Sequence, residues 1–420
     1  MINQIKDLIF TDTGKDTAIV FTGTIVNAAV GGIFFILAPR ILGPADYGLF
    51  SVVIATGIMV ANLANLGIDT GVLRFVKGED SESQKILKLA LESYLVIGLL
   101  VFVLGFVLSL PMARILGQPN ISPLLKIAFS GVIFVLLTDF VQAVLQSKKK
   151  FLEASIVNIV SNVSRLLILL IAAYFFQINV YFLTFLFFFI YIVSVITGKL
   201  FVPLDFLKEK DHRAHFKKFF AFNSWIAASL AISSVPLDNY FLLKFAGPVA
   251  TGIYAAPYKI LAITDQLAGN FSRVLAPRFS SFTNDTQAII FSKKTIPIVL
   301  FVISAILTAG ILAEPIVRIL LGNEYINSIP VFRVVAASYA FYFADTIAVS
   351  LIVYYLGKPN ITFLITIIVI IIWAISSYIL IPKYQAIGAA FADLISGITA
   401  LSLFTGFVVW HFSKKIRTHE

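Results

Sequence analysis

The sequence predicts an all-α polytopic membrane protein, with twelve transmembrane helices in two six-helix lobes around a central cavity. Three observations support this fold class. First, 59% of the residues are hydrophobic and only 13% are charged, whereas soluble domains carry about 25% charged residues. Second, apolar stretches of about 20 residues, the length that crosses a bilayer, recur along the whole chain. Third, a pattern in residues 1–205 recurs in 206–420.

The internal repeat has a nearly constant offset of about 204 residues. Its matched segments are Arg40–Pro44 with Lys244–Pro248, Gly48–Phe50 with Gly252–Tyr254, Arg74 with Arg278, and Arg114 with Arg318. Six crossings per repeat is an even number, so both halves insert in the same direction. We therefore expect a pseudo-two-fold axis along the membrane normal, as in transporters built from parallel repeats.

Twelve apolar stretches are long enough to span the membrane. The first exceeds the core of a signal peptide, which is about 7–15 residues, so it is expected to be a span. Two stretches, 180–202 and 360–381, are almost purely apolar and are expected at the lipid rim. The predicted spans are 17–38, 47–68, 87–110, 123–146, 154–176, 180–202, 219–243, 252–276, 291–313, 328–355, 360–381 and 385–411.

Lys and Arg are concentrated in the loops that face the cytoplasm if the N-terminus is inside. This asymmetry predicts a multi-pass cell-membrane protein with both termini in the cytoplasm. It also accounts for the net charge of +10, so no nucleic-acid partner is expected. The predicted parts are a cytoplasmic segment 1–16, an N-lobe 17–202, a linker 203–218, a C-lobe 219–411 and a tail 412–420.

Polar residues in two predicted spans form stripes along one helical face. Lys259, Gln266 and Arg273 recur every seven residues with Asn270 beside them, and Asn158, Asn162 and Arg165 are spaced four and three residues apart. A charged side chain in the bilayer costs about 2.5–3.5 kcal/mol, so such residues usually face protein or water. These stripes are candidate binding residues for a substrate headgroup in a hydrated cavity. The alternative is that they join helices by hydrogen bonds.

Three further candidates for headgroup binding are Asn62, Arg74 and Arg278. The two arginines lie near the predicted inner helix ends, where their side chains could equally reach lipid headgroups.

The intramembrane carboxylates Asp139, Asp345 and Asp265 are candidate sites for coupling transport to H⁺ or Na⁺. The alternative is that each pairs with a basic residue.

The chain contains no cysteine, which excludes thiol catalysis and thiolate metal sites. It also has no phosphate-binding glycine loop, nucleotide motif or catalytic Ser/His/Asp arrangement. We therefore expect neither an enzyme nor a bound metal or cofactor.

Residues 37–50, Leu-Ala-Pro-Arg-Ile-Leu-Gly-Pro-Ala-Asp-Tyr-Gly-Leu-Phe, are followed by a long span, Leu66–Asp69 and Arg74-Phe75. In these features the chain resembles the polysaccharide-transporter (oligosaccharide flippase) family of the multidrug/oligosaccharidyl-lipid/polysaccharide exporter superfamily. The resemblance covers the whole length and implies a flippase for a polyprenyl-(pyro)phosphate-linked oligosaccharide. The lipid-linked oligosaccharide would move from the cytoplasmic to the outer leaflet by alternating access, for cell-surface glycan assembly. The resemblance also implies membrane lipids and glycan-assembly enzymes as partners.

Three other classes of function fit parts of the sequence. The main alternative is a cation-coupled multidrug antiporter of the same fold, which would favour an acidic, aromatic cavity. A membrane-embedded glycosyltransferase and a scaffold for glycan enzymes are further alternatives. The sequence leaves the glycan and the choice of undecaprenyl or dolichyl carrier open.

Overall fold

The computed structural model describes residues 12–76, 78, 80–210, 219–220, 223 and 236–417, with side chains from residue 22 to residue 413 in the two terminal helices. The chain divides into two compact units. Unit 1 comprises Met1–Leu42 and Leu49–Tyr240, and unit 2 comprises Gly43–Gly48 and Phe241–Glu420. All regular secondary structure in the described residues is helical.

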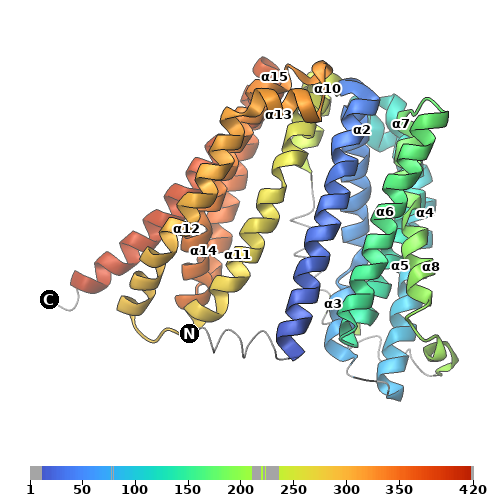
Figure 1. Cartoon of the computed structure of the whole chain (residues 1–420), viewed down its shortest axis with the longest axis horizontal. Helices are drawn as coiled ribbons and strands as arrows, with labels where there is room; N and C mark the ends of the chain where they lie inside the picture. Colours follow the sequence, from blue (N-terminus) through green and yellow to red (C-terminus); the bar gives the residue numbers. More distant parts are fainter. Residues whose placement is uncertain are drawn as a thin grey trace. The chain divides into compact units, whose positions relative to one another are not determined.

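Unit 1 is built from α2 and the helices that follow it (Figure 1). They are α2 Asp12–Asn65, α3 Ile68–Phe75, α4 Ser81–Ile115, η1 Pro119–Ile121, α5 Ser122–Ser147, α6 Phe151–Phe175, α7 Val180–Phe189, α8 Tyr191–Lys199 and η2 Asp205–Lys208. Unit 2 contains α10 Leu237–Leu261, α11 Ile263–Ser281, α12 Asp285–Ile311, α13 Ala313–Leu320, η4 Asn323–Tyr325, α14 Ser328–Ser350, the π-helical turn η5 Leu351–Tyr355 and α15 Pro359–Arg417.

The repeat seen in the sequence reappears in the helix boundaries. Helix α4 begins after Asp80, whose carboxylate accepts a hydrogen bond from the Ser83 backbone N–H at 3.0 Å. At the repeat-related position, Asn284 caps α12 by accepting from the Gln287 N–H at 2.9 Å. Both caps satisfy a backbone donor that has no partner within its own helix. The repeat-related helices α4 and α12 therefore begin in the same way, with a side-chain oxygen that accepts a backbone hydrogen bond.

Both long helices that carry the Gly-Pro motif bend at its glycine. Gly43 in α2 (φ 70, ψ 171) and Gly247 in α10 (φ 81, ψ −179) adopt the same backbone conformation, which glycine reaches without steric cost. Within unit 2 the segment after Gly43 packs on α10. A Cβ on Gly48 would collide with the Pro248 carbonyl.

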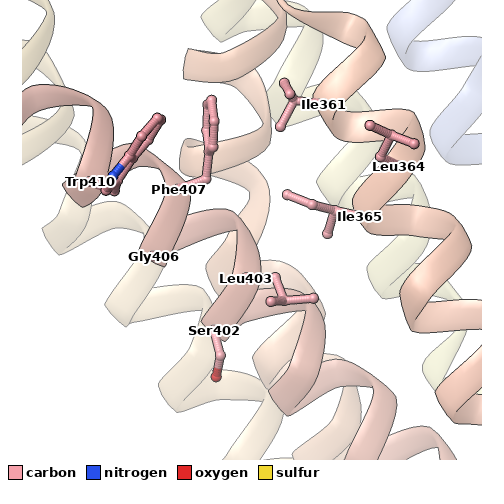
Figure 2. A pocket seen from close by; sticks show the side chains of 8 residues that line it. All are labelled: Ile361, Leu364, Ile365, Ser402, Leu403, Gly406, Phe407 and Trp410. Carbon is pink, nitrogen blue, oxygen red and sulfur yellow. The ribbon is translucent and has the colours of Figure 1, made fainter.

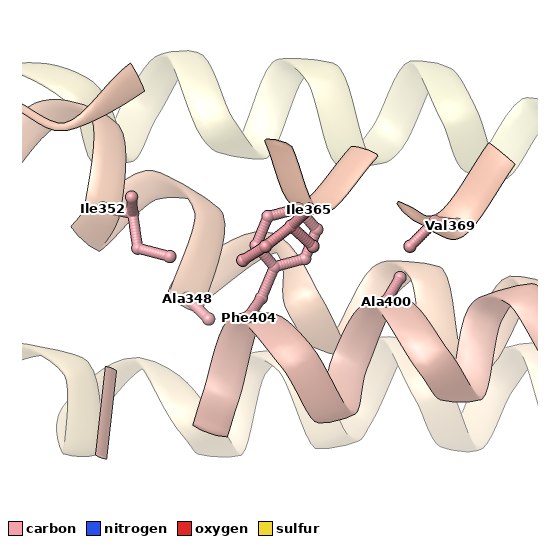
Figure 3. Packing of buried hydrophobic residues seen from close by; sticks show 6 residues of the cluster. All are labelled: Ala348, Ile352, Ile365, Val369, Ala400 and Phe404. Carbon is pink, nitrogen blue, oxygen red and sulfur yellow. The ribbon is translucent and has the colours of Figure 1, made fainter. Parts of the chain in front are cut away.

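One helix lies at the centre of each unit. In α5 and in α14, 61% of the residues in the most apolar, membrane-spanning part of the helix are buried, compared with 17% to 44% in the other long apolar helices. Figure 1 shows α14 running beside α11, α12 and α15, and all three contact it. A break in the helical backbone at Gln385 divides α15 into two arms. Ala348, Ile352 and Phe404 belong to an apolar cluster in which α14 and η5 contact both arms (Figure 3).

Other helices expose large apolar side chains, as expected for a surface that faces lipid. Along α4, Val96, Leu99 and Val107 are exposed to 59%, 60% and 66%. A contiguous apolar surface of this kind is unusual in a soluble monomer. The protein is thus an all-α, multi-pass membrane protein.

Eight helices in the described residues are long and apolar enough to cross a membrane, compared with twelve predicted stretches. Some predicted boundaries lie inside continuous helices, because α2 contains the stretches 17–38 and most of 47–68, and α15 contains 360–381 and 385–411. Most of the stretch 219–243, and residues 211–218 of the predicted linker, lie outside the described residues.

Candidate functional site

Arg165 of α6 lies inside unit 1, where three aromatic rings enclose it. Its guanidinium carbon is 5.5 Å from the ring centroid of Phe34, 4.7 Å from Phe187 and 5.4 Å from Tyr191. The residue is only 5% exposed. Each such cation–π contact contributes about 0.5–1 kcal/mol at an exposed site and about 2 kcal/mol where water is excluded. We call Arg165 and these three rings the aromatic cage.

A chain of amides connects the aromatic cage to α2. Asn162 accepts from Arg165 at 3.3 Å and donates to Asn27 at 3.2 Å. Asn158 is half-buried on the same helix. Among the described residues, no carboxylate forms an ion pair with Arg165, and its Nε has no hydrogen-bond partner. A role for Arg165 in headgroup binding stays a prediction, and it requires the rings to move apart.

The cage includes Phe187 of α7, in the stretch 180–202 that was expected at the lipid rim. One face of this stretch is buried at Leu183, Phe187 and Phe188 because α7 packs against α5. The other face exposes Tyr181, Phe185 and Ile196, so the place at the lipid rim stays a prediction. The ring of Phe187 carried no polar signal in the sequence.

The predicted polar stripe lies at the surface of unit 2 and is divided between two helices, with Lys259 in α10 and Gln266, Asn270 and Arg273 in α11. Lys259, Gln266 and Arg273 are exposed and Asn270 is half-buried. Arg273 donates to Asn270 at 3.5 Å. We call these four residues the polar row. Arg278, one turn further along α11, is also exposed.

The two remaining headgroup candidates lie at surfaces of unit 1. Asn62 of α2 is exposed. Arg74 of α3 is also exposed, and its guanidinium carbon lies 5.9 Å from the Phe75 ring centroid.

Asp265 begins α11 next to the polar row and has two kinds of partner. It accepts a hydrogen bond from Tyr339 at 3.1 Å and interacts electrostatically with Lys259. Tyr258 stacks on Tyr254 and lies 5.8 Å from the ring of Tyr339. Both roles offered for Asp265, ion coupling and pairing with a basic residue, stay predictions.

Asp345 and Asp139 occupy the two central helices. Asp345 in α14 is buried, with 9% of its surface exposed. Asp139 in α5 is half-buried and accepts from the Asn65 side-chain amide at 3.1 Å.

Sequence reasoning missed Asp393 of α15. Its carboxylate accepts from the Tyr254 hydroxyl at 2.5 Å and from the Trp373 indole N–H at 2.8 Å. The available signal was a single acid inside an otherwise apolar stretch, which usually marks a functional or paired residue.

An open apolar groove lies between the two arms of α15 (Figure 2). It has a volume of about 420 Å³. It is lined by Ile361, Leu364, Ile365, Ser402, Leu403, Gly406, Phe407 and Trp410. In the described part of the chain, no three His, Asp or Glu side chains gather as they would around a metal ion.

Three comparisons with known proteins agree with this architecture. The family described as "Polysaccharide biosynthesis protein" matches residues 13–283. The chain is 26% identical over 216 residues to the capsular polysaccharide biosynthesis protein CapF of Staphylococcus aureus, a match that covers 50% of this chain and 53% of CapF. The matched region thus spans about half the length of that curated relative.

Two solved structures are similar over nearly the whole chain. The lipid II flippase MurJ in an inward closed conformation aligns with a TM-score of 0.68 at 16% identity, covering 94% of this chain and 87% of MurJ. An inward-facing multidrug resistance MATE family transporter of the MOP superfamily aligns with a TM-score of 0.67 at 14% identity, covering 92% and 94%. At these identities the likeness shows the fold alone.

Proposed function

Because the chain belongs to the polysaccharide biosynthesis protein family, we propose that it is a flippase for a polyprenyl-(pyro)phosphate-linked oligosaccharide. In this proposal the protein acts as a membrane transporter in polysaccharide biosynthesis and not as an enzyme. Its proposed cargo moves from the cytoplasmic to the outer leaflet of the cell membrane by alternating access.

The polar row carries this proposal. Its two cations, Lys259 of α10 and Arg273 of α11, are exposed in a membrane protein, where a charge is costly unless water, a ligand or an opposite charge compensates it. Asp265 acts on Lys259 in this way, and Arg273 is the cation that a ligand would solvate. Ammonium and guanidinium groups form strong, charge-assisted hydrogen bonds with phosphate oxygens. Gln266 and Asn270 add donors and acceptors of the kind that sugar hydroxyls need. A sugar-phosphate headgroup matches this combination.

Helix lengths support ten of the proposed twelve crossings, because two of the eight long apolar helices are long enough to cross twice. The apolar part of α2, Thr22–Asn65, has 44 residues and that of α15, Pro359–Ser413, has 55. At about 1.5 Å per residue, each exceeds twice the roughly 30 Å thickness of the hydrocarbon core. We propose that each crosses twice, with breaks at Gly43 and Gln385, where the backbone is not helical.

The proposed topology keeps the boundaries expected from the sequence. The N-lobe is 17–202 and the C-lobe is 219–411, joined by a cytoplasmic linker 203–218, with both termini in the cytoplasm. The proposed partners are the lipid-linked glycan, membrane lipids and glycan-assembly enzymes.

A cation-coupled multidrug antiporter is the second candidate, and one observation favours it. Asp393 lies against Tyr254 and Trp373, and Tyr258 stacks on Tyr254. An acidic group among aromatic rings suits an organic cation.

Transport by the purified chain in proteoliposomes separates the two candidates. One assay follows arrival of a fluorescent polyprenyl-pyrophosphate oligosaccharide in the outer leaflet, and a parallel assay follows export of a cationic dye. We expect glycolipid movement without dye export. Replacing Lys259 and Arg273 together by Gln should slow glycolipid movement at least tenfold, whereas Lys208→Gln, in an exposed surface pair with Asp205, should not. Dye export without glycolipid movement would overturn the flippase proposal.

A further inference from the structure

The apolar groove between the two arms of α15 is formed by antiparallel helices. Ile365 and Val369 of the first arm pack beside Phe404 and Ala400 of the second (Figure 3). The start of the first arm and the end of the second therefore lie at the same end of the groove, where Trp410 is found. The lining residues of the second arm extend from 402 to 410, which is about 12 Å of helix at 1.5 Å per residue.

The walls of the groove are apolar and leave open space (Figure 2). Leu364 and Trp410 are 54% and 55% exposed. Ser402 donates its hydroxyl to the Ile398 carbonyl at 2.7 Å, so this polar atom already has a partner. Gly406 has no side chain, and a Cβ added there would find nothing within 4 Å. An alkyl chain can therefore lie over Gly406 without displacing a neighbouring side chain.

A cation lies at the end of the groove that contains Trp410. Lys358 comes just before α15, and its carbonyl accepts the Ile361 N–H at 3.1 Å. Its ammonium lies 5.9 Å from the ring centroid of Phe407, which lines the groove. No carboxylate among the described residues forms an ion pair with Lys358. The last turns of α15 add the basic residues Lys414, Lys415 and Arg417.

We propose that this groove binds one acyl chain of an anionic phospholipid, whose phosphate lies at Lys358. Basic pockets between membrane helices attract anionic headgroups, and tryptophan is enriched at the level of the headgroups. Lys358 and Trp410 provide both features at one end of the groove. The apolar walls continue from that end and suit the upper part of an acyl chain.

The unpaired cation favours a lipid over a second copy of this chain. An apolar side chain from another copy would fill the groove but leave the charge of Lys358 without a partner. An anionic phospholipid satisfies the apolar walls and the cation together, because an ammonium forms strong hydrogen bonds with phosphate oxygens.

This inference concerns a lipid bound to the resting protein and does not depend on the proposed glycolipid cargo. It can therefore fail while glycolipid transport stands, and the reverse is also possible.

The test is quenching of Trp410 fluorescence by brominated lipids in vesicles that hold the purified full-length chain. The chain has three tryptophans, so the Trp410 signal is the difference between the wild type and Trp410→Phe. Bromine in the upper half of the acyl chains quenches an indole that it contacts. We expect half-maximal quenching at a mole fraction about three- to tenfold lower for brominated phosphatidylglycerol than for brominated phosphatidylcholine, the effect of one lysine on an anionic lipid.

Two variants with matched controls assign this preference to the groove. Lys358→Gln should remove it, whereas Lys383→Gln, at an exposed position of the same helix, should keep it. Gly406→Leu should also remove it by filling the groove. Gly269→Leu changes another glycine with nothing within 4 Å of an added Cβ and should behave like the wild type.

Equal quenching by the two lipids in the wild type would overturn the proposal, as would a preference that Lys358→Gln retains. A polyprenyl phosphate that displaces brominated phosphatidylglycerol more effectively than unbrominated phosphatidylglycerol would assign the groove to the lipid carrier instead. A dimer of the wild type that dissociates in Gly406→Leu would assign it to a second copy. If Gly406→Leu does not fold, the comparison of Lys358→Gln with Lys383→Gln decides the question.

Discussion

The same helix of the two repeats carries an acid in one half and a base in the other. Asp69 in α3 and Arg273 in α11 are related by the repeat offset of about 204 residues. Asp69 is half-buried near Asp139, whereas Arg273 is exposed. The position related to Asp139 is Phe343, which stacks on Phe271 of α11 at 5.7 Å. Unit 2 thus has an aromatic contact where unit 1 has a pair of carboxylates.

The backbone differs at the same place. In unit 1 the left-handed Leu66 and Gly67 separate α2 from α3, whereas α11 continues as one helix from Ile263 to Ser281. One duplicated element therefore carries a half-buried acid in unit 1 and an exposed base in unit 2.

Reversing the charge of Arg273 tests this comparison most severely. Arg273→Asp gives α11 the acid that α3 carries and places a negative charge in the polar row. We expect at least a tenfold loss of glycolipid movement in proteoliposomes, because carboxylate and phosphate repel. Lys208→Asp is the control for charge reversal at an exposed position. Normal movement by Arg273→Asp would mean that the polar row does not contact the headgroup.

The repeat-related glycines test a place where the halves have stayed alike. A Cβ on Gly252 would collide with the Pro44 carbonyl, as one on Gly48 would with Pro248, and main chain cannot easily give way. We expect Gly252→Ala to lower the free energy of unfolding by about 1–3 kcal/mol, the usual cost of overpacking. Gly269→Ala is the matched control, because nothing lies within 4 Å of its added Cβ. Equal thermal midpoints for the two variants would contradict this close packing.

Two conservative changes compare a buried arginine with an exposed one. Arg165→Lys replaces a planar group that fits against three rings by a compact ammonium, so we expect a loss of about 1–2 kcal/mol of stability. Arg273→Lys, at the surface, should leave the thermal midpoint in detergent unchanged. If Arg165→Lys is equally silent, the aromatic cage does not hold the guanidinium.

The smallest expected effect concerns the two N-caps. Hydrogen bonds from the Ser83 hydroxyl and backbone N–H hold the pKa of Asp80, outside the predicted crossing 87–110, below its ordinary value. A carboxyl with a lowered pKa in the folded state stabilises that state above its unfolded pKa of about 3.9, and the contribution is lost as the pH falls through the folded value.

Asp80→Asn gives α4 the neutral cap that Asn284 provides for α12. Thermal midpoints from pH 7 to pH 3 should show a slightly less stable variant at pH 7, with the difference shrinking as the pH falls from about 4 toward 3. A difference that is constant across this range would show that the charge of Asp80 is unimportant.

Much of the helical framework could be predicted from hydrophobic length alone. The stretches 87–110 and 123–146 fall within α4 and α5, and 154–176 ends one residue beyond α6, because each is a continuous apolar run bounded by polar residues. The local breaks were harder. The left-handed turn at Leu66 lies inside a predicted span, since a leucine gives no sign of a positive φ.

The sites were only partly predictable, because their members come from distant segments. Polar spacing predicted the polar row on one helix, but α10 ends at Leu261, so Lys259 lies on a different helix from its other three members. The cost of an intramembrane charge pointed to Arg165 and Asp139. The ring of Phe187 and the hydroxyl of Tyr94 meet these residues through packing of separate helices. The local sequence of an apolar helix does not predict which charged residue of another helix it will contact.

The most direct test of the central claim is the rate at which the purified wild-type chain moves a polyprenyl-pyrophosphate oligosaccharide between leaflets of proteoliposomes, measured beside the variant with Lys259 and Arg273 both changed to Gln. The flippase account expects rapid movement by the wild type and a reduction of at least tenfold in the variant. Movement no faster than in protein-free liposomes, or equal rates for both proteins, would contradict it.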